Sequence, residues 1–156
     1  TVLTISAVGS PKVVFTKIMP SLYGTAYGTM FKVYKPQGKK MAVNHLVSAY
    51  PDAHRKPKTK WTITSDLEVS DFVTAKALIQ KNPALPVKLA KRPAATYAQI
   101  LHIGTYATEN PTITLLHKYM KEEKLTVVGP HEEVYLSRPG PKAKTVIRYA
   151  VKKRIK

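Results

Sequence analysis

The sequence Pro57-Lys58-Thr59-Lys60-Trp61-Thr62-Ile63 returns in diverged form as Pro141-Lys142-Ala143-Lys144-Thr145-Val146-Ile147. A tyrosine precedes each copy across a proline-containing loop, Tyr50 in the first half of the chain and Tyr135 in the second. A pattern that recurs together with the same order of predicted elements indicates a duplicated structural unit. We therefore expect two similar halves, each ending in a long hairpin.

Alternating and β-branched runs predict strands, and apolar residues at helical spacing predict helices. The predicted strands cover residues 12–18, 40–50, 60–69, 95–106, 126–137 and 144–152. The predicted helices cover residues 20–35, residues 74–81 and a segment that starts at Asn110-Pro111, where Asn is a good cap and Pro a good first residue. Residues 31–34 could instead form a strand. Gly24 and Gly28, four residues apart, predict close packing against the first helix.

Two strand-helix-strand-strand units would pair into one antiparallel sheet. The expected fold class is therefore α+β, with helices on one face of the sheet and a ligand groove on the other. We expect a single domain over residues 1–156. Its predicted parts are a first repeat at 11–69, a linking helix and Pro-rich linker at 70–93, and a second repeat at 94–153.

The composition excludes several classes of site. The chain has 156 residues and no cysteine, which excludes a disulfide scaffold, a Cys-based zinc site and a Cys nucleophile. Its five histidines show no metal-ligand spacing and it has no nucleotide-binding motif, so we expect no metal and no cofactor. No apolar run approaches the ~20 residues of a membrane span. We expect a cytoplasmic protein with no membrane partner.

The net charge of +17 leaves an alternative function open. Residues 1–70 hold 10 basic and 3 acidic groups, and residues 71–156 hold 16 and 6. A basic surface attracts nucleic acid and other anions. A nucleic-acid- or protein-binding module without catalysis is therefore the alternative, and it is not favoured because the basic residues are scattered and no recognition motif is present.

Several stretches resemble the GyrI-like family. In the second half these are residues 99–106, His131-Glu132-Glu133-Val134-Tyr135-Leu136-Ser137 and residues 144–149, and in the first half residues 22–27 and Asp71-Phe72-Val73-Thr74. The first-half stretches look like the stand-alone branch of the family, and the likeness covers most of residues 12–152. The family includes effector domains of multidrug-responsive regulators, and some stand-alone members hydrolyse cyclopropane-containing genotoxins. The family commonly shows Ser-Asp-Pro where this chain has Ser137-Arg138-Pro139.

Glu133 and Tyr135 are the predicted catalytic residues. Strand alternation places both on one face and Val134 on the other, which we expect to pack under the helices. From the residues alone, an exposed glutamate on a sheet face is the simpler interpretation. The resemblance implies instead that Glu133 is a buried carboxylate in the ligand groove. Such a group can act as an acid or base or bind a cation by charge.

The predicted ligand-binding residues are mainly aromatic. Trp61, the only tryptophan, would be a platform for a planar or cationic ligand, with a core tryptophan as the equal alternative. Tyr50 and Tyr106 are expected to line the same groove. His102 matches the pattern of the family, where a histidine is more often structural than catalytic.

Two related functions and one unrelated function follow. The first is binding of a small, aromatic or cationic organic molecule around the buried carboxylate. The second is hydrolysis of an electrophilic, cyclopropane-type toxin in the same groove. The third is the basic nucleic-acid- or protein-binding module. The sequence does not determine the oligomeric state.

Overall fold

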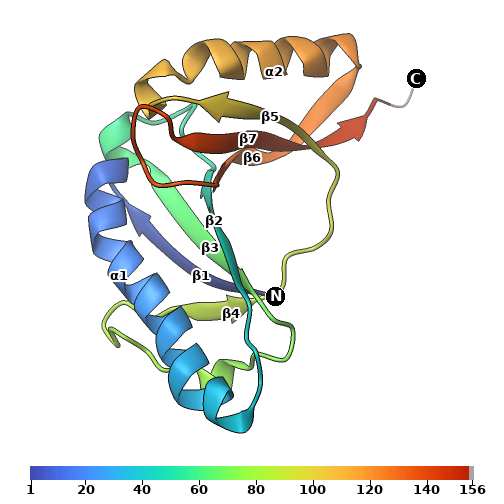
Figure 1. Ribbon diagram of the computed structural model, residues 1–156. Coiled ribbons are helices and arrows are strands. Elements are labelled where there is room, and N and C mark those ends of the chain that lie inside the picture. The colour runs from blue at the N-terminus through green and yellow to red at the C-terminus, as the bar shows by residue number, and fades with distance from the viewer. Residues whose placement is uncertain (155–156) are drawn as a thin grey trace.

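The computed structural model describes residues 1–154, so the last two residues of the predicted domain lie outside the described part. Seven strands form one antiparallel sheet that carries two helices (Figure 1). The strands are β1 (Val2–Val8), β2 (Val43–Tyr50), β3 (Thr62–Val69), β4 (Lys88–Ala90), β5 (Tyr97–Ile103), β6 (Leu125–Tyr135) and β7 (Lys144–Lys153). The helices are α1 (Pro11–Thr29), extended by a π-helical turn over Met30–Tyr34, and α2 (Asn110–Glu122). No helix among these residues is long and apolar enough to cross a membrane.

The sheet consists of two copies of one strand-helix-strand-strand unit. The runs β1-α1-β2-β3 and β5-α2-β6-β7 have the same element order. The strand order β4-β1-β3-β2-β6-β7-β5 places the units back to back, joined by β2 and β6. In that pairing Ser48 lies opposite Glu133 and Tyr50 lies opposite His131. The predicted α+β class with duplicated units is confirmed, and β4 is an added edge strand within the predicted linker.

The start of the first unit differs from the prediction. The strand predicted over residues 12–18 is wrong, because α1 begins at Pro11 and continues past Pro20. Val14, Ile18 and Leu22 recur every four residues and are buried against the sheet, which is a helical pattern. Proline is well tolerated in the first helical turn, where its missing N–H has no partner to lose. The opening strand is instead β1, which the sequence did not predict.

The helix predicted over residues 74–81 is also wrong. Only Ala75–Ala77 forms a single 3-10 turn. The backbone N–H groups of Ile79 and Lys81 donate to threonine hydroxyls of α1, at 2.9 and 3.1 Å, instead of to a helix of their own. The predicted close packing against the glycines does occur, since a Cβ on Gly24 would lie 2.6 Å from Cγ of Lys81.

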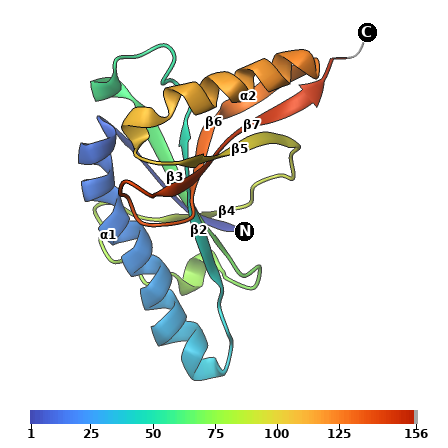
Figure 2. The same cartoon turned by 45° about the horizontal axis from the view of Figure 1, so that its top comes forward.

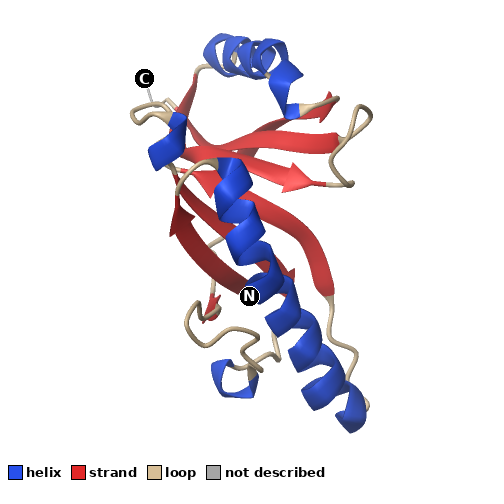
Figure 3. Cartoon of the chain, turned by 90° about the vertical axis from the view of Figure 1, so that its left-hand side faces the viewer, coloured by secondary structure: helices blue, strands red, loops and turns tan. Residues whose placement is uncertain are grey.

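Both helices pack on the same face of the sheet. Figure 3 shows α1 crossing in front of the strands, and Figure 2 shows α2 along β5 and β7. Residues that lie directly opposite each other on paired strands point to the same face of the sheet. Ser65 lies opposite Ser48, Ser48 opposite Glu133, and Glu133 opposite Ile147. Ile147 packs under α2. Glu133 therefore points to the helix-bearing face, and Val134 faces away. The prediction of a groove on the opposite face is wrong, because alternation separates two sets of side chains without saying which set the helices cover.

Leu116 provides a test of how α2 is held on the sheet. Its side chain is 2% exposed, whereas that of the adjacent Leu115 is 59% exposed. We expect Leu116→Ala to lower the free energy of unfolding by about 2–5 kcal/mol, because it removes buried methyl groups and leaves a cavity. Leu115→Ala should change it by less than about 0.5 kcal/mol. Urea denaturation measures both, and equal losses would contradict this packing.

Candidate functional site

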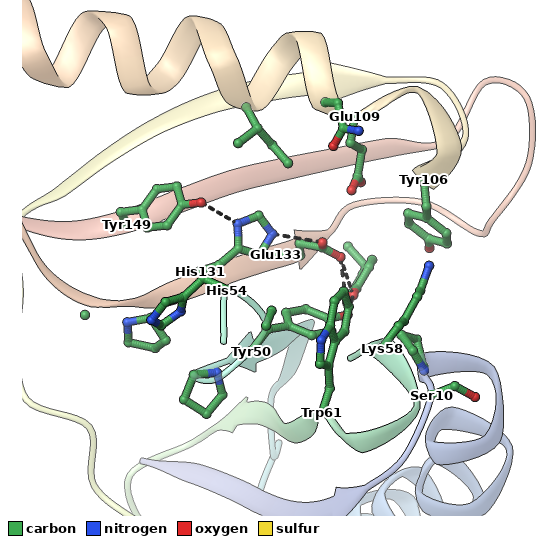
Figure 4. A pocket seen from close by; sticks show the side chains of 18 of the residues that line it. Ser10, Tyr50, His54, Lys58, Trp61, Tyr106, Glu109, His131, Glu133 and Tyr149 are labelled. Atoms are coloured by element: carbon green, nitrogen blue, oxygen red, sulfur yellow. Dashed lines mark hydrogen bonds and ion pairs between the residues drawn. The ribbon is translucent and has the colours of Figure 1, made fainter. Parts of the chain in front are cut away.

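A groove opens on the helix-bearing face, between the first turns of α1 and α2 (Figure 4). Its volume is about 1340 Å³, enough for a drug-sized organic molecule. The walls come from the first turn of α1, the loop between β2 and β3, the segment that leads into α2, and the strands β6 and β7. Its lining contains two lysines and two glutamates, Lys12, Lys58, Glu109 and Glu133.

Glu133 lies in this groove and is 7% exposed. The Tyr135 hydroxyl donates to its Oε2 at 2.6 Å, and the Tyr50 hydroxyl lies 2.6 Å from that of Tyr135 and 3.4 Å from Oε2. Each hydroxyl has one proton, so Tyr135 donates to Glu133 and Tyr50 donates to Tyr135. On the other side, Nε2 of His131 lies 3.0 Å from Oε1, and its Nδ1 lies 2.8 Å from the Tyr149 hydroxyl. Donation from Nε2 leaves Nδ1 to accept from Tyr149.

The tyrosines around Glu133 are donors that hold their protons. Burial, followed by the charge of Glu133, raises the pKa of Tyr50 and of Tyr135 far above the ordinary value of a phenol. The pKa of Tyr106 is raised for the same two reasons. These hydroxyls therefore stay protonated near neutral pH and can donate to a carboxylate, a ligand or a water.

Aromatic rings form the rest of the wall. Trp61 packs edge to face on Tyr50 with ring centroids 5.9 Å apart, and Tyr106 packs edge to face on Tyr135 at 6.0 Å. The Lys58 ammonium lies over the Trp61 ring, 5.8 Å from its centroid. The groove thus already accommodates one cation above an indole face.

Asp52 fixes the loop that carries Trp61. Its carboxylate accepts from the backbone N–H of Thr62 at 2.9 Å and pairs with the Lys56 ammonium at 2.6 Å. The hydrogen bond from Lys56, followed by that from Thr62, lowers the pKa of Asp52 to about 2. The indole N–H of Trp61 donates to the carbonyl of Lys56 at 2.9 Å. The ring is therefore positioned before any ligand arrives.

Glu109, immediately before α2, is a second carboxyl in the groove. It is 6% exposed, and its Oε1 is buried without a hydrogen-bond partner. Burial, followed by the charge of Glu133, raises the pKa of Glu109 to about 8. At neutral pH Glu109 is therefore mainly a neutral acid that faces Glu133 (Figure 4).

The structure brings most of the predicted site residues together. The groove is lined by five of them, Tyr50, Trp61, Tyr106, Glu133 and Tyr135. His102 lies elsewhere and is buried beside the start of α2. Its ring nitrogens bond the hydroxyl of Thr112 at 2.9 Å and the carbonyl of Thr105 at 3.1 Å. Its placement is that of a histidine that fixes a turn, and it does not line the groove with the other predicted residues.

Sequence reasoning missed Glu109, His131 and Tyr149. His131 had a readable signal, because it lies two residues before Glu133 on the same strand and so shares its face. Glu109 had a weaker one, its place directly before the Asn110-Pro111 helix start. Tyr149 had none, since its contact with His131 depends on the pairing of β6 with β7.

No metal centre is formed by the described part of the chain. Within residues 1–154, no three His, Cys, Asp or Glu side chains are grouped so that they could hold a metal ion. The chemistry available in the groove is therefore that of carboxyls, phenols, an imidazole and aromatic faces.

The raised pKa of Glu109 gives stability a defined pH dependence. Folded Glu109 binds its proton up to about pH 8, whereas the unfolded group releases it near pH 4.5. Between these values the folded state binds more protons, so the contribution of this group to the free energy of unfolding falls as pH rises. Comparison of urea denaturation at pH 5, 6.5 and 8 should show that Glu109→Gln loses this slope. The control Glu123→Gln, at an exposed position at the end of α2, should keep the pH dependence of the wild type. The same pH dependence in Glu109→Gln would refute the raised pKa of Glu109.

Comparisons with known proteins identify the fold and the family. Residues 1–152 match the model of the GyrI-like small molecule binding domain. A solved structure of an uncharacterized conserved protein from Listeria innocua is 26% identical, with a TM-score of 0.85 over 97% of this chain and 87% of that chain. A structure described as a hydrolase from Listeria innocua is also 26% identical, with a TM-score of 0.80 over 97% of this chain and 86% of that one.

A third similarity is to a regulator and shows the fold alone. The C-terminal domain of EcmrR is 14% identical, with a TM-score of 0.69 over 98% of this chain and 91% of that domain. A search of curated proteins found no match. Because the family model spans nearly the whole chain, this protein belongs to the GyrI-like family of small-molecule-binding domains.

Proposed function

We propose that the groove binds a flat, aromatic organic cation, with its charge against Glu133 and its ring against Trp61. The observation that carries this proposal is the buried carboxylate of Glu133, held by tyrosine and histidine donors among aromatic faces. Taking an organic cation out of water has a high cost, which a buried carboxylate offsets. Aromatic faces add attraction to the cation and bury its apolar surface.

Lys58 supports the same class of ligand. Its ammonium already lies over the Trp61 ring, and its side chain extends from a loop at the edge of the groove. A ligand cation can take the position of this ammonium over the indole, while Lys58 turns to solvent. The ligand then exchanges one cation–π contact for another and gains the charge of Glu133.

A fluorescence titration with N-methylacridinium, a flat cation with a permanent charge, tests the proposal. We expect saturable quenching of Trp61 and a Kd raised about tenfold or more by Glu133→Gln, since a charged contact is worth about 1.5–3 kcal/mol. Glu132→Gln is the matched control, because Glu132 lies on the opposite face and pairs with Arg148. Equal Kd values for the wild type and Glu133→Gln would contradict the proposal.

Hydrolysis of an electrophile is a second candidate, favoured by the two carboxyls of different charge. Glu133 is arranged to accept a proton from water, and Glu109 carries a proton to give. In a cyclopropane conjugated to a carbonyl, water attacks a ring carbon and a C–C bond breaks, with its electron pair passing to the carbonyl. Glu133 takes the proton of water and Glu109 protonates the new anion, so the net change is addition of one water. The similar Listeria innocua structure described as a hydrolase supports this candidate.

Mass spectrometry of an aryl ketone conjugated to a cyclopropane, incubated with the protein, tests this candidate. We expect the mass of one water to be added in the presence of wild-type protein, and the rate to fall at least about a hundredfold in Glu133→Gln, the lower end of the usual loss when a general base is removed. Glu132→Gln should keep the wild-type rate. A substrate that binds but gains no water under these conditions would leave binding as the function and refute hydrolysis.

A further inference from the structure

The groove contains a carboxyl that no protein cation pairs with. Glu109 is 6% exposed and its Oε1 has no hydrogen-bond partner, whereas Glu133 accepts from Tyr135 and His131. Among the residues described, no ion pair joins Glu109 to a lysine or arginine. A buried carboxyl oxygen without a partner costs stability, and such groups are commonly completed by a ligand or a proton.

Groups from four segments of the chain act on Glu109. Charge and hydroxyl groups near it come from β6, β2, the segment before α2 and the β2–β3 loop, namely Glu133, Tyr50, Tyr106 and Lys58. The negative charge of Glu133 disfavours the ionised form of Glu109, and the two tyrosines are neutral. Only Lys58 favours the ionised form. Near neutral pH Glu109 therefore ionises fully only when more positive charge enters the groove.

We propose that Glu109 is a second ligand-anchoring carboxyl, which exchanges its proton for the charge of the incoming cation. This inference rests on the proposed function, since it concerns how the same groove takes its ligand. In the exchange, neutral Glu109 and a cation become a carboxylate–cation pair, and the proton goes to solvent. Two carboxylates then face two positive charges, that of the ligand and that of the Lys58 ammonium, which stays at the edge of the groove.

The exchange has a calculable size. With its pKa raised to about 8, Glu109 is mainly protonated at pH 7, so binding should release most of one proton. Below pH 8 the affinity for a cation with a permanent charge should therefore rise by up to about tenfold for each unit of pH increase, and it should level off above pH 8. The neighbouring tyrosines contribute no protons in this range, because burial and the charge of Glu133 raise their pKa values.

Isothermal titration calorimetry measures this proton directly. N-methylacridinium is titrated into the protein at pH 7 in phosphate and in Tris, whose ionisation enthalpies differ, and the difference in heat counts the protons released. We expect release of most of one proton for the wild type and for the control Glu123→Gln, and almost none for Glu109→Gln. N-methylacridone, neutral and of nearly the same shape, should bind without proton release.

The outcomes separate this inference from the proposed function. If neither the cation nor the neutral probe binds the wild type, the proposed function fails and this inference fails with it. If the cation binds with no proton release, or with equal release in Glu109→Gln, the groove binds cations but Glu109 does not exchange its proton. Glu109→Asp keeps the carboxyl and replaces Glu109→Gln as the test if that variant does not fold. It should still release a proton when the cation binds. Loss of proton release in Glu109→Asp would also overturn the proposed exchange.

Discussion

The pairing of β2 with β6 is the constraint on which the other features depend. It joins the two duplicated units into one sheet, and its register sets Ser48 opposite Glu133 and Tyr50 opposite His131. A shift by one residue would turn Glu133 to the outer face, because side chains alternate along a strand. The same register brings the Tyr50 hydroxyl within 2.6 Å of that of Tyr135. One strand pair therefore determines both the fold and the first contacts of the buried carboxylate.

The helices leave a gap over this seam. The two units meet at β2 and β6, so α1 covers one half of the face, α2 covers the other, and neither covers the middle. The seam is polar there, with Ser48 and Ser65 hydrogen-bonded at 2.8 Å and Glu133 beside them. A duplicated unit thus creates a site at its own junction, where each half contributes one wall and where the hydrogen-bonded carboxylate is already positioned for a ligand.

The sequence predicted the second unit better than the first for physical reasons. The strands at 126–137 and 144–152 and the helix from Asn110 were predicted within a few residues, because their alternation and their capping pattern are unambiguous. The run at 12–18 is β-branched and short, and such runs fit a strand or a buried helix equally well. The groove residues Glu133 and Tyr135 were found from alternation and from resemblance. The side of the sheet on which they lie, and the presence of Glu109 beside them, depend on long-range packing that no local pattern records.

A groove with two buried carboxyls, in a protein of net charge +17, sets conditions on the cation that we propose as its ligand. Surface lysines repel cations at long range, but in physiological salt this repulsion is screened over about 8 Å. Inside the groove the interaction is far less screened, and there the carboxyls of Glu133 and Glu109 dominate. A small inorganic cation gains little in this environment, because it loses its hydration without covering the aromatic walls. A flat organic cation gives up less hydration and can cover Trp61 and Tyr106, so the proposed ligand class combines charge with apolar area.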